Sequence, residues 1–351
     1  MLWIAGADAL GPAVRHMRGG RLTQFLGQQL KHEGWEGCHF YDLIFPLFVF
    51  MMGVSITFSL GRLVAAQGRA GAVARIFRRA LLMYVLGLFF YGGFSTPIDQ
   101  FRLVGVLQRL AICYFFAALF FIYLKPRGLV AVCVALLAGY WAMLTFAPVP
   151  GIGAGHFVEG QNFANWVDKR FLPGRKWYGD HDPEGLLSNL PAIASCLLGV
   201  FAGLVLRDGR RSERQKAVAL AVGGAVLLAA GLLWGMQFPI IKKIWTSSYV
   251  LVAGGWSALL LAAFYLVIDV WKVRTWATPF VWIGTNALTI YLIGNVVDFE
   301  QLSLRFAGGD VAAWLNARWA GLGALVLALV GMGICTAICR FLYQRKIFLR
   351  L

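Results

Sequence analysis

The sequence predicts an all-α polytopic membrane protein with about ten transmembrane helices in a single bundle. The chain has 351 residues, of which 60% are hydrophobic and only 14% are charged, and its mean hydropathy is +0.70. A soluble core of a chain this long cannot bury so much apolar surface. The apolar stretches run for about 20 residues each, which is the length that a helix needs to cross a bilayer, whereas barrel strands would show short alternating segments.

Ten apolar segments are predicted to span the membrane within one domain that covers residues 1–351. They lie at approximately 1–14, 43–65, 76–94, 104–124, 128–147, 186–206, 216–236, 249–270, 278–297 and 319–343. The first segment is too short to span and has neither a basic n-region nor a cleavage site. We therefore expect either a half-span or a helix whose true start lies upstream of Met1.

Charge between the spans predicts the orientation. The connections after the even-numbered spans and the C-terminal tail carry 18 Lys and Arg but three acidic residues, whereas the opposite side carries 14 basic and 13 acidic residues. The positive-inside rule then makes the C-terminus cytoplasmic and the long loop 148–185 external. The net charge of +16 is accordingly a topology signal and does not predict nucleic-acid binding. All five histidines fall on the outer side: His16, His32, His39, His156 and His181.

The segment 30–46 concentrates ionisable side chains immediately before an apolar span. Glu33 and Trp35 are close neighbours of His32, and Asp42 stands where the span begins. A histidine at the outer mouth of a membrane bundle suits a general base or an acyl acceptor near neutral pH. Asp42 and Glu33 are equally suited to helix capping, so both roles stay open for them.

Polar residues within or beside other spans are further candidates, because each costs free energy unless it is paired or used. They are Asp8, Gln108, Arg109, Asp182, Glu184, Trp245, Ser248, Tyr249 and Asn286. Arg109 requires a carboxylate partner or a water-filled cavity, and Asp42 or Asp99 could be that partner. Asp182 suits the N-cap of a helix, and the carboxylates of Asp182 and Glu184 also suit a cationic amino sugar.

Two other features are interpreted as structural. Gly199 and Gly203, together with the pairs 223–224 and 254–255, suit close helix packing in lipid, and exposed stripes of small residues are compatible with a homodimer. Cys335 and Cys339 share a helix face, but no histidine or carboxylate lies near them in the sequence, so we predict no metal site.

Five separated motifs identify a resemblance that covers nearly the whole chain. They are Lys31-His32-x-x-Trp35-x-Gly37 leading to Asp42-Leu43-Ile44-Phe45-Pro46; Gly105-Val106-Leu107-Gln108-Arg109-Leu110; Asp182-Pro183-Glu184-Gly185; Trp245-Thr246-Ser247-Ser248-Tyr249-Val250; and Arg345-Lys346-Ile347-Phe348. In this order they resemble the heparan-alpha-glucosaminide N-acetyltransferases of lysosomes and their bacterial inner-membrane relatives.

The resemblance implies that acetyl moves from cytoplasmic acetyl-CoA, the donor substrate, to the amine of a glucosamine-type sugar on the periplasmic side of an inner membrane. It implies that His32 is catalytic and that Asp8 stands where the family has a polar residue in the preceding helix. Substrate contacts are then expected at Trp35, Glu33, Asp42, Asp182, Glu184, Trp245 and Tyr249, and acetyl-CoA contacts at Gln108, Arg109, Ser248 and Asn286.

Two alternatives stay open at this point. An amino-sugar permease, or a sugar-responsive membrane protein without chemistry, also agrees with ten spans and scattered intramembrane polar residues, although no internal repeat is visible. O-acylation of a cell-envelope glycan would differ only in the acceptor.

Overall fold

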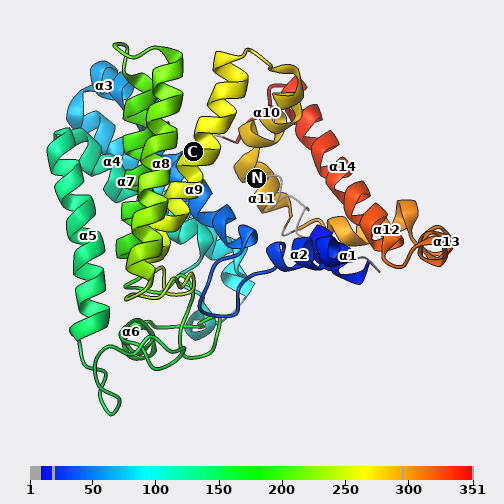
Figure 1. Ribbon diagram of the computed structural model, residues 1–351, viewed down its shortest axis with the longest axis horizontal. Coiled ribbons are helices and arrows are strands. Elements are labelled where there is room, and N and C mark those ends of the chain that lie inside the picture. Colours follow the sequence, from blue (N-terminus) through cyan, green and yellow to red (C-terminus); the bar gives the residue numbers. More distant parts are fainter. Residues whose placement is uncertain (1–8, 18–19, 96, 295, 350–351) are drawn as a thin grey trace. The chain divides into compact units, whose positions relative to one another are not determined.

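The computed structural model describes residues 9–17, 20–95, 97–294 and 296–349, and these residues form helices joined by turns and loops (Figure 1). No β-strand occurs in these ranges; pairing is limited to isolated bridges, such as the one between Glu36 and Ile241. The predicted all-α class is therefore confirmed for the described residues.

The chain divides into two compact units, each of which is discontinuous in sequence. The first unit comprises Met1–His32, His39–Ile44 and Lys272–Arg350; the second comprises Glu33–Cys38, Phe45–Trp271 and Leu351. The single bundle expected from the sequence stays a prediction.

The second unit holds most of the long helices. They are α3 (Ile44–Phe90), α4 (Val106–Tyr123), α5 (Pro126–Phe146), α6 (Phe163–Phe171), α7 (Asn189–Arg207), α8 (Glu213–Gly235) and α9 (Ser247–Tyr265), which continues into a π-helical turn, Leu266–Val270. Helix α7 contacts α4, α5, α8 and α9, and α8 and α9 form an antiparallel pair. Figure 1 shows the long connection with α6 gathered at the end of this unit where α5 and α8 finish.

The first unit is built around α14 (Leu322–Gln344). Its other helices are α1 (Leu10–His16), α2 (Arg21–Gln29), α10 (Thr278–Thr285), α11 (Ala287–Ile293), α12 (Phe299–Ala307) and α13 (Asp310–Arg318). Helix α14 contacts α1, α10, α12 and α13, and α1 also packs on α2.

Seven helices within the described residues are long and apolar enough to cross a membrane: α3, α4, α5, α7, α8, α9 and α14. The chain is therefore a multi-pass membrane protein, and these helices cover eight of the ten predicted spans. The predicted spans 43–65 and 76–94 both lie in α3, which has 47 residues and one non-helical residue, Gly68, at φ 70° and ψ 177°. A straight helix of that length would measure about 70 Å, more than twice a hydrocarbon core of about 30 Å, so the break at Gly68 separates two spans.

The remaining two predictions are not confirmed. The segment 278–297 is interrupted at Asn286, whose φ of −111° and ψ of 21° separate the short helices α10 and α11. Most of the first half-span, including Asp8, lies outside the described residues, and α1 begins only at Leu10.

Glycines permit the closest helix contacts in the second unit, as the sequence predicts. A Cβ at Gly199 would lie 1.8 Å from the carbonyl oxygen of Phe50, and one at Gly53 would lie 2.0 Å from that of Cys196. Gly203 meets the side chain of Thr57. Helices α3 and α7 therefore pack backbone to backbone, which in lipid replaces the hydrophobic effect as the source of helix association.

Candidate functional site

The first unit contains a histidine–carboxylate pair formed by two residues of the segment 30–46. His32 Nδ1 lies 2.8 Å from Asp42 Oδ1. The Asp42 side chain is 1% exposed, whereas that of His32 is 55% exposed. The Tyr41 ring lies against the imidazole, with 4.5 Å between ring centroids. A buried carboxylate thus orients an imidazole that solutes can reach.

Asp42 has the capping role, one of the two roles that the sequence left open for it. Its second oxygen, Oδ2, accepts a hydrogen bond of 3.0 Å from the backbone N–H of His39, at the start of the short 3₁₀ turn Phe40–Leu43. Phe40 N–H is bound in turn by the Gln29 side chain. The cap fixes the carboxylate, and the carboxylate then fixes His32. Because an ionised carboxylate only accepts hydrogen bonds, Nδ1 of a neutral His32 carries the proton and Nε2 carries the lone pair.

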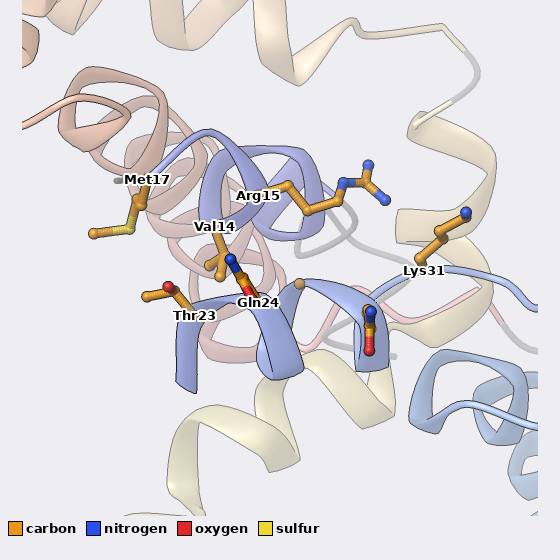
Figure 2. Close-up of a pocket in the computed structure, with 8 residues that line it drawn as sticks. Val14, Arg15, Met17, Thr23, Gln24 and Lys31 are labelled. Atoms are coloured by element: carbon orange, nitrogen blue, oxygen red, sulfur yellow. The ribbon is translucent and has the colours of Figure 1, made fainter. Parts of the chain in front are cut away.

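A cavity of about 360 Å³ lies between α1 and α2 in the same unit (Figure 2). Its lining residues are Val14, Arg15, Met17, Thr23, Gln24, Gly27, Gln28 and Lys31. Two of them, Arg15 and Lys31, are basic, and Lys31 directly precedes His32. None of the residues predicted for the site lines this cavity.

The residues that follow His32 belong to the second unit. Trp35 Nε1–H donates a hydrogen bond of 2.8 Å to the carbonyl of Phe157 in the long loop. Gly37 N–H donates to the carbonyl of Ile240, 2.8 Å away, in the connection between α8 and α9. Gly37 has φ 120°, which a residue with a side chain rarely adopts. Glu33 Oε1 accepts from Gly34 N–H, so this carboxylate helps to shape the turn.

A buried ion-pair cluster anchors the long loop of the second unit. Arg102 binds both oxygens of Asp182 at 2.8 and 2.7 Å and Glu184 Oε2 at 2.7 Å. Its guanidinium also lies 4.4 Å from the Tyr91 ring centre and 4.9 Å from that of Trp177. Arg102 is 6% exposed, so a fully enclosed guanidinium has its charge matched by two carboxylates.

Asp182 and Glu184 therefore already have a cationic partner within the protein. The oxygens of Asp182 also accept from the backbone N–H groups of Trp177 and Glu184, at 2.9 and 3.0 Å. The predicted N-cap role of Asp182 is wrong, because α7 begins at Asn189. The side chain instead closes an Asx-type turn, which binds backbone N–H groups as well as a cap does.

The carboxyl groups of this cluster titrate differently because their partners differ. Burial acts to raise the pKa of Asp182, but the Arg102 guanidinium and two backbone N–H donors outweigh it and hold that pKa below its usual range. Burial raises the pKa of Glu184, although Arg109 and Arg102 oppose the rise. Burial also raises the pKa of Asp168 to about 6, against hydrogen bonds from the N–H groups of Leu186 and Asp182.

Arg109 and Gln108 occupy the first turn of α4 and are each 1% exposed. Arg109 donates to the Ser188 hydroxyl through Nη2 and lies 4.7 Å from the Trp245 ring centre. Its charge acts on the carboxyl groups of Glu184 and Asp168. A pairing of Arg109 with Asp42 or Asp99 stays a prediction. Among the described residues, Arg109 Nε and Nη1 and both side-chain heteroatoms of Gln108 have no hydrogen-bond partner.

Trp245 and Tyr249, predicted as substrate contacts, lie in the core of the second unit. They are 1% and 0% exposed, and Trp245 Nε1–H donates to Ser195 Oγ at 3.1 Å. Ser248 Oγ donates to the Pro239 carbonyl at 3.1 Å. These contacts position the start of α9.

Asn286 belongs to the first unit. Its Nδ2 donates to the Trp282 carbonyl at 3.1 Å, whereas its Oδ1 has no partner among the described residues. The amide thus satisfies part of the helix break between α10 and α11 and keeps one acceptor available.

Arg102 and Asp168 are functional candidates that the sequence did not predict. Arg102 stands in a short connection where an arginine is an ordinary topology signal, and its partners lie 80 and 82 residues away. No local pattern identifies such a pairing. The one available signal is the motif 182–185, whose two carboxylates at a membrane edge require a cation.

Comparison with known proteins gives two relatives of one kind. The chain is 27% identical over 375 residues to the heparan-alpha-glucosaminide N-acetyltransferase of Mus musculus, covering 91% of this chain and 56% of the relative. This chain is a distant relative of the heparan-alpha-glucosaminide N-acetyltransferases. The Homo sapiens protein of the same name is 25% identical over 374 residues, covering 91% of this chain and 55% of the relative. The chain spans about half the length of these curated relatives, and no family model matches it.

Proposed function

We propose that this chain is a membrane N-acetyltransferase that moves acetyl from cytoplasmic acetyl-CoA to the amine of a glucosamine-type sugar on the periplasmic side of a bacterial inner membrane. The proposal is based on the His32–Asp42 hydrogen bond of 2.8 Å. It is also based on the similarity of the chain to two heparan-alpha-glucosaminide N-acetyltransferases. A reachable imidazole oriented by a buried carboxylate is the arrangement that acyl transfer requires of its base.

Asp42 would hold the Nδ1–H tautomer and stabilise the imidazolium that forms. Nε2 of His32 would take the proton from the acceptor ammonium, and the resulting amine would attack the thioester carbonyl while the coenzyme A thiolate leaves. In the alternative, Nε2 would attack the thioester carbonyl and the coenzyme A thiolate would leave; the deprotonated acceptor amine would then attack the acetyl-imidazole, and the imidazole of His32 would leave with its Nε2 lone pair restored. Asp8, which lies outside the described residues, is proposed to assist the imidazole in either route.

The donor side is proposed to involve Gln108 and Arg109. Their buried heteroatoms without partners would bind the amide and carbonyl groups of a pantetheine arm, because burying such groups unpaired costs free energy. Asn286 is also proposed to contact acetyl-CoA, with its Oδ1 as a hydrogen-bond acceptor. Ser248, whose hydroxyl is hydrogen-bonded to that of Thr246, is proposed as a further acetyl-CoA contact. The basic loops would meet the phosphates of coenzyme A at the cytoplasmic surface.

The test is acetyl transfer by the full chain in proteoliposomes that contain glucosamine, with labelled acetyl-CoA supplied outside. His32→Ala should abolish N-acetylglucosamine formation, because the variant lacks the proposed proton acceptor. His156→Ala, at an exposed histidine of the long loop, is the control and should retain activity. Equal activity in His32→Ala would remove the assignment.

The same preparation separates the alternatives. Labelled acetyl-His32 found without glucosamine would select the two-step route. Release of unmodified glucosamine that does not depend on acetyl-CoA would instead indicate a permease.

A further inference from the structure

The second unit holds a lysine ammonium in a setting built from rings and a carboxylate. Lys243 Nζ lies 2.8 Å from Glu159 Oε1. It also lies 4.4 Å from the centre of the Tyr178 ring and 5.5 Å from that of Trp35. We call these four residues the Lys243 cluster. They come from the segment 33–38, from two parts of the long loop and from the connection between α8 and α9.

A neighbouring histidine, His181, contacts two residues of the Lys243 cluster, Tyr178 and Glu159. The His181 ring stacks on Tyr178, with centroids 5.2 Å apart and 30° between planes. Its Nε2 lies 3.4 Å from Glu159 Oε1, and its Nδ1 lies 2.7 Å from Asp180 Oδ1. The His181 side chain is only 6% exposed, so it fixes the carboxylate and the ring that face Lys243.

This geometry exceeds what a surface ion pair needs. An exposed Lys–Glu pair contributes little, whereas the Lys243 side chain is only 19% exposed and its ammonium also meets two aromatic faces. Faces of Trp and Tyr beside a carboxylate are instead a receptor for a small monocation, because ring quadrupole and carboxylate charge attract the same group. Glu159 is 38% exposed and Tyr178 is 42% exposed, so solvent contacts two of the three residues that surround the Lys243 ammonium.

We propose that Trp35, Tyr178 and Glu159 form the subsite for the protonated amine of the acceptor, and that the Lys243 ammonium fills it until the acceptor displaces it. The proposal rests on the proposed function for the identity of the acceptor as an amino sugar. Trp35 follows His32 by only three residues in the chain. Lys243 then competes with the acceptor for the subsite. The apparent affinity for the acceptor is the intrinsic affinity multiplied by the fraction of time that Lys243 leaves the subsite empty.

The test is binding of glucosamine, glucose and N-acetylglucosamine to the full chain in nanodiscs, measured by calorimetry without acetyl-CoA. A pH near 6 keeps the glucosamine amine protonated, since such amines titrate at about 8. Lys243→Ala should lower the dissociation constant of glucosamine at least about fivefold, because the competitor is gone. The two neutral sugars should bind as they do to the unaltered protein.

Two further variants guard the result. Glu159→Gln should raise the dissociation constant of glucosamine by about tenfold in the Lys243→Ala background, as expected for loss of a charge-assisted hydrogen bond. Lys169→Ala removes the same charge from a side chain that is 69% exposed in the same loop and should change nothing. Lys243→Met, which keeps the packing of the stem on the rings, should reproduce Lys243→Ala if the alanine variant is poorly folded.

Equal or weaker glucosamine binding by Lys243→Ala and Lys243→Met would overturn the proposal, as would the same gain for glucose. Because binding is measured without the donor, failure of acetyl transfer would remove the proposed function and leave this subsite standing. Transfer that depends on His32 but shows no gain in the Lys243 variants would remove the subsite alone.

Discussion

The His32–Asp42 pair and the Arg102–Asp182–Glu184 cluster use the same contact for different ends. In both, a cationic or protonatable nitrogen lies 2.7 to 2.8 Å from a carboxylate that solvent hardly reaches. The His32 side chain is 55% exposed, however, whereas that of Arg102 is 6% exposed and is enclosed by two carboxylates and two aromatic rings.

The two sites differ in whether the nitrogen group that binds the carboxylate can change its protonation state. An imidazole beside one buried carboxylate can exchange a proton with a solute while its orientation is kept. A guanidinium is always charged, and that of Arg102 binds two carboxylates through Nε and Nη2, so we expect the cluster to hold the loop in place. We therefore expect substitutions at the first site to change transfer and those at the second to change stability.

The largest effect is expected for Arg102→Met. Removing the guanidinium leaves Asp182 and Glu184 buried without their ion-pair partner, which typically costs about 3–5 kcal/mol. Thermal unfolding in detergent measures the loss. Arg170→Met, at an exposed arginine of α6, is the matched control and should unfold like the unaltered protein. Equal midpoints for the two variants would mean that the cluster does not stabilise the loop.

Asp42→Asn is expected to lower acetyl transfer by about 10²–10⁴-fold, because an amide can favour the wrong imidazole tautomer and no longer stabilises the imidazolium. Its unfolding midpoint should fall by far less than that of Arg102→Met, since the asparagine oxygen can still accept from His39 N–H. Initial rates in proteoliposomes measure the change. Asp99→Asn, an exposed carboxylate, serves as the control, and similar rates in both variants would break the contrast.

The smallest effect concerns the pH dependence of the loop that the cluster anchors. Burial raises the pKa of Asp168 to about 6, so its contribution to stability is full below the unfolded value of about 4 and is lost as the pH rises through 6. Asp168→Asn cannot ionise. Its unfolding midpoint should therefore rise relative to that of the unaltered protein between pH 4 and pH 7. A constant difference across this range would show that Asp168 does not titrate there.

The sequence predicted the long helices well because each requires about 20 apolar residues in succession, which is a local property. It also predicted the close packing at Gly199 and Gly203. It failed at Asn286, where one residue interrupts an otherwise helical pattern and only the backbone angles reveal it. The break at Gly68, in contrast, lies between the predicted spans 43–65 and 76–94. The predicted number of spans depended most on these two positions.

The sequence also predicted some features of the candidate site and not others. His32, Asp42 and Trp35 stood out because ionisable and aromatic residues clustered within one short segment. Trp245 and Tyr249 looked equally polar at a membrane edge, yet they are core residues. Burial depends on neighbours that arrive from distant segments, so composition alone could not separate these two groups.

By itself, the sequence determined that the chain is helical, that it crosses a membrane several times and that a histidine lies beside carboxylates before an apolar span. Hydrophobic length and residue spacing suffice for these conclusions because both act along the chain. Only the tertiary structure decided that Asp42 orients His32, that Arg102 engages Asp182 and Glu184, and that Lys243 lies between Glu159 and two rings. The hydrogen bonds among these contacts join residues 10 to 84 positions apart, and electrostatic attraction between such residues acts only where the fold brings their side chains together.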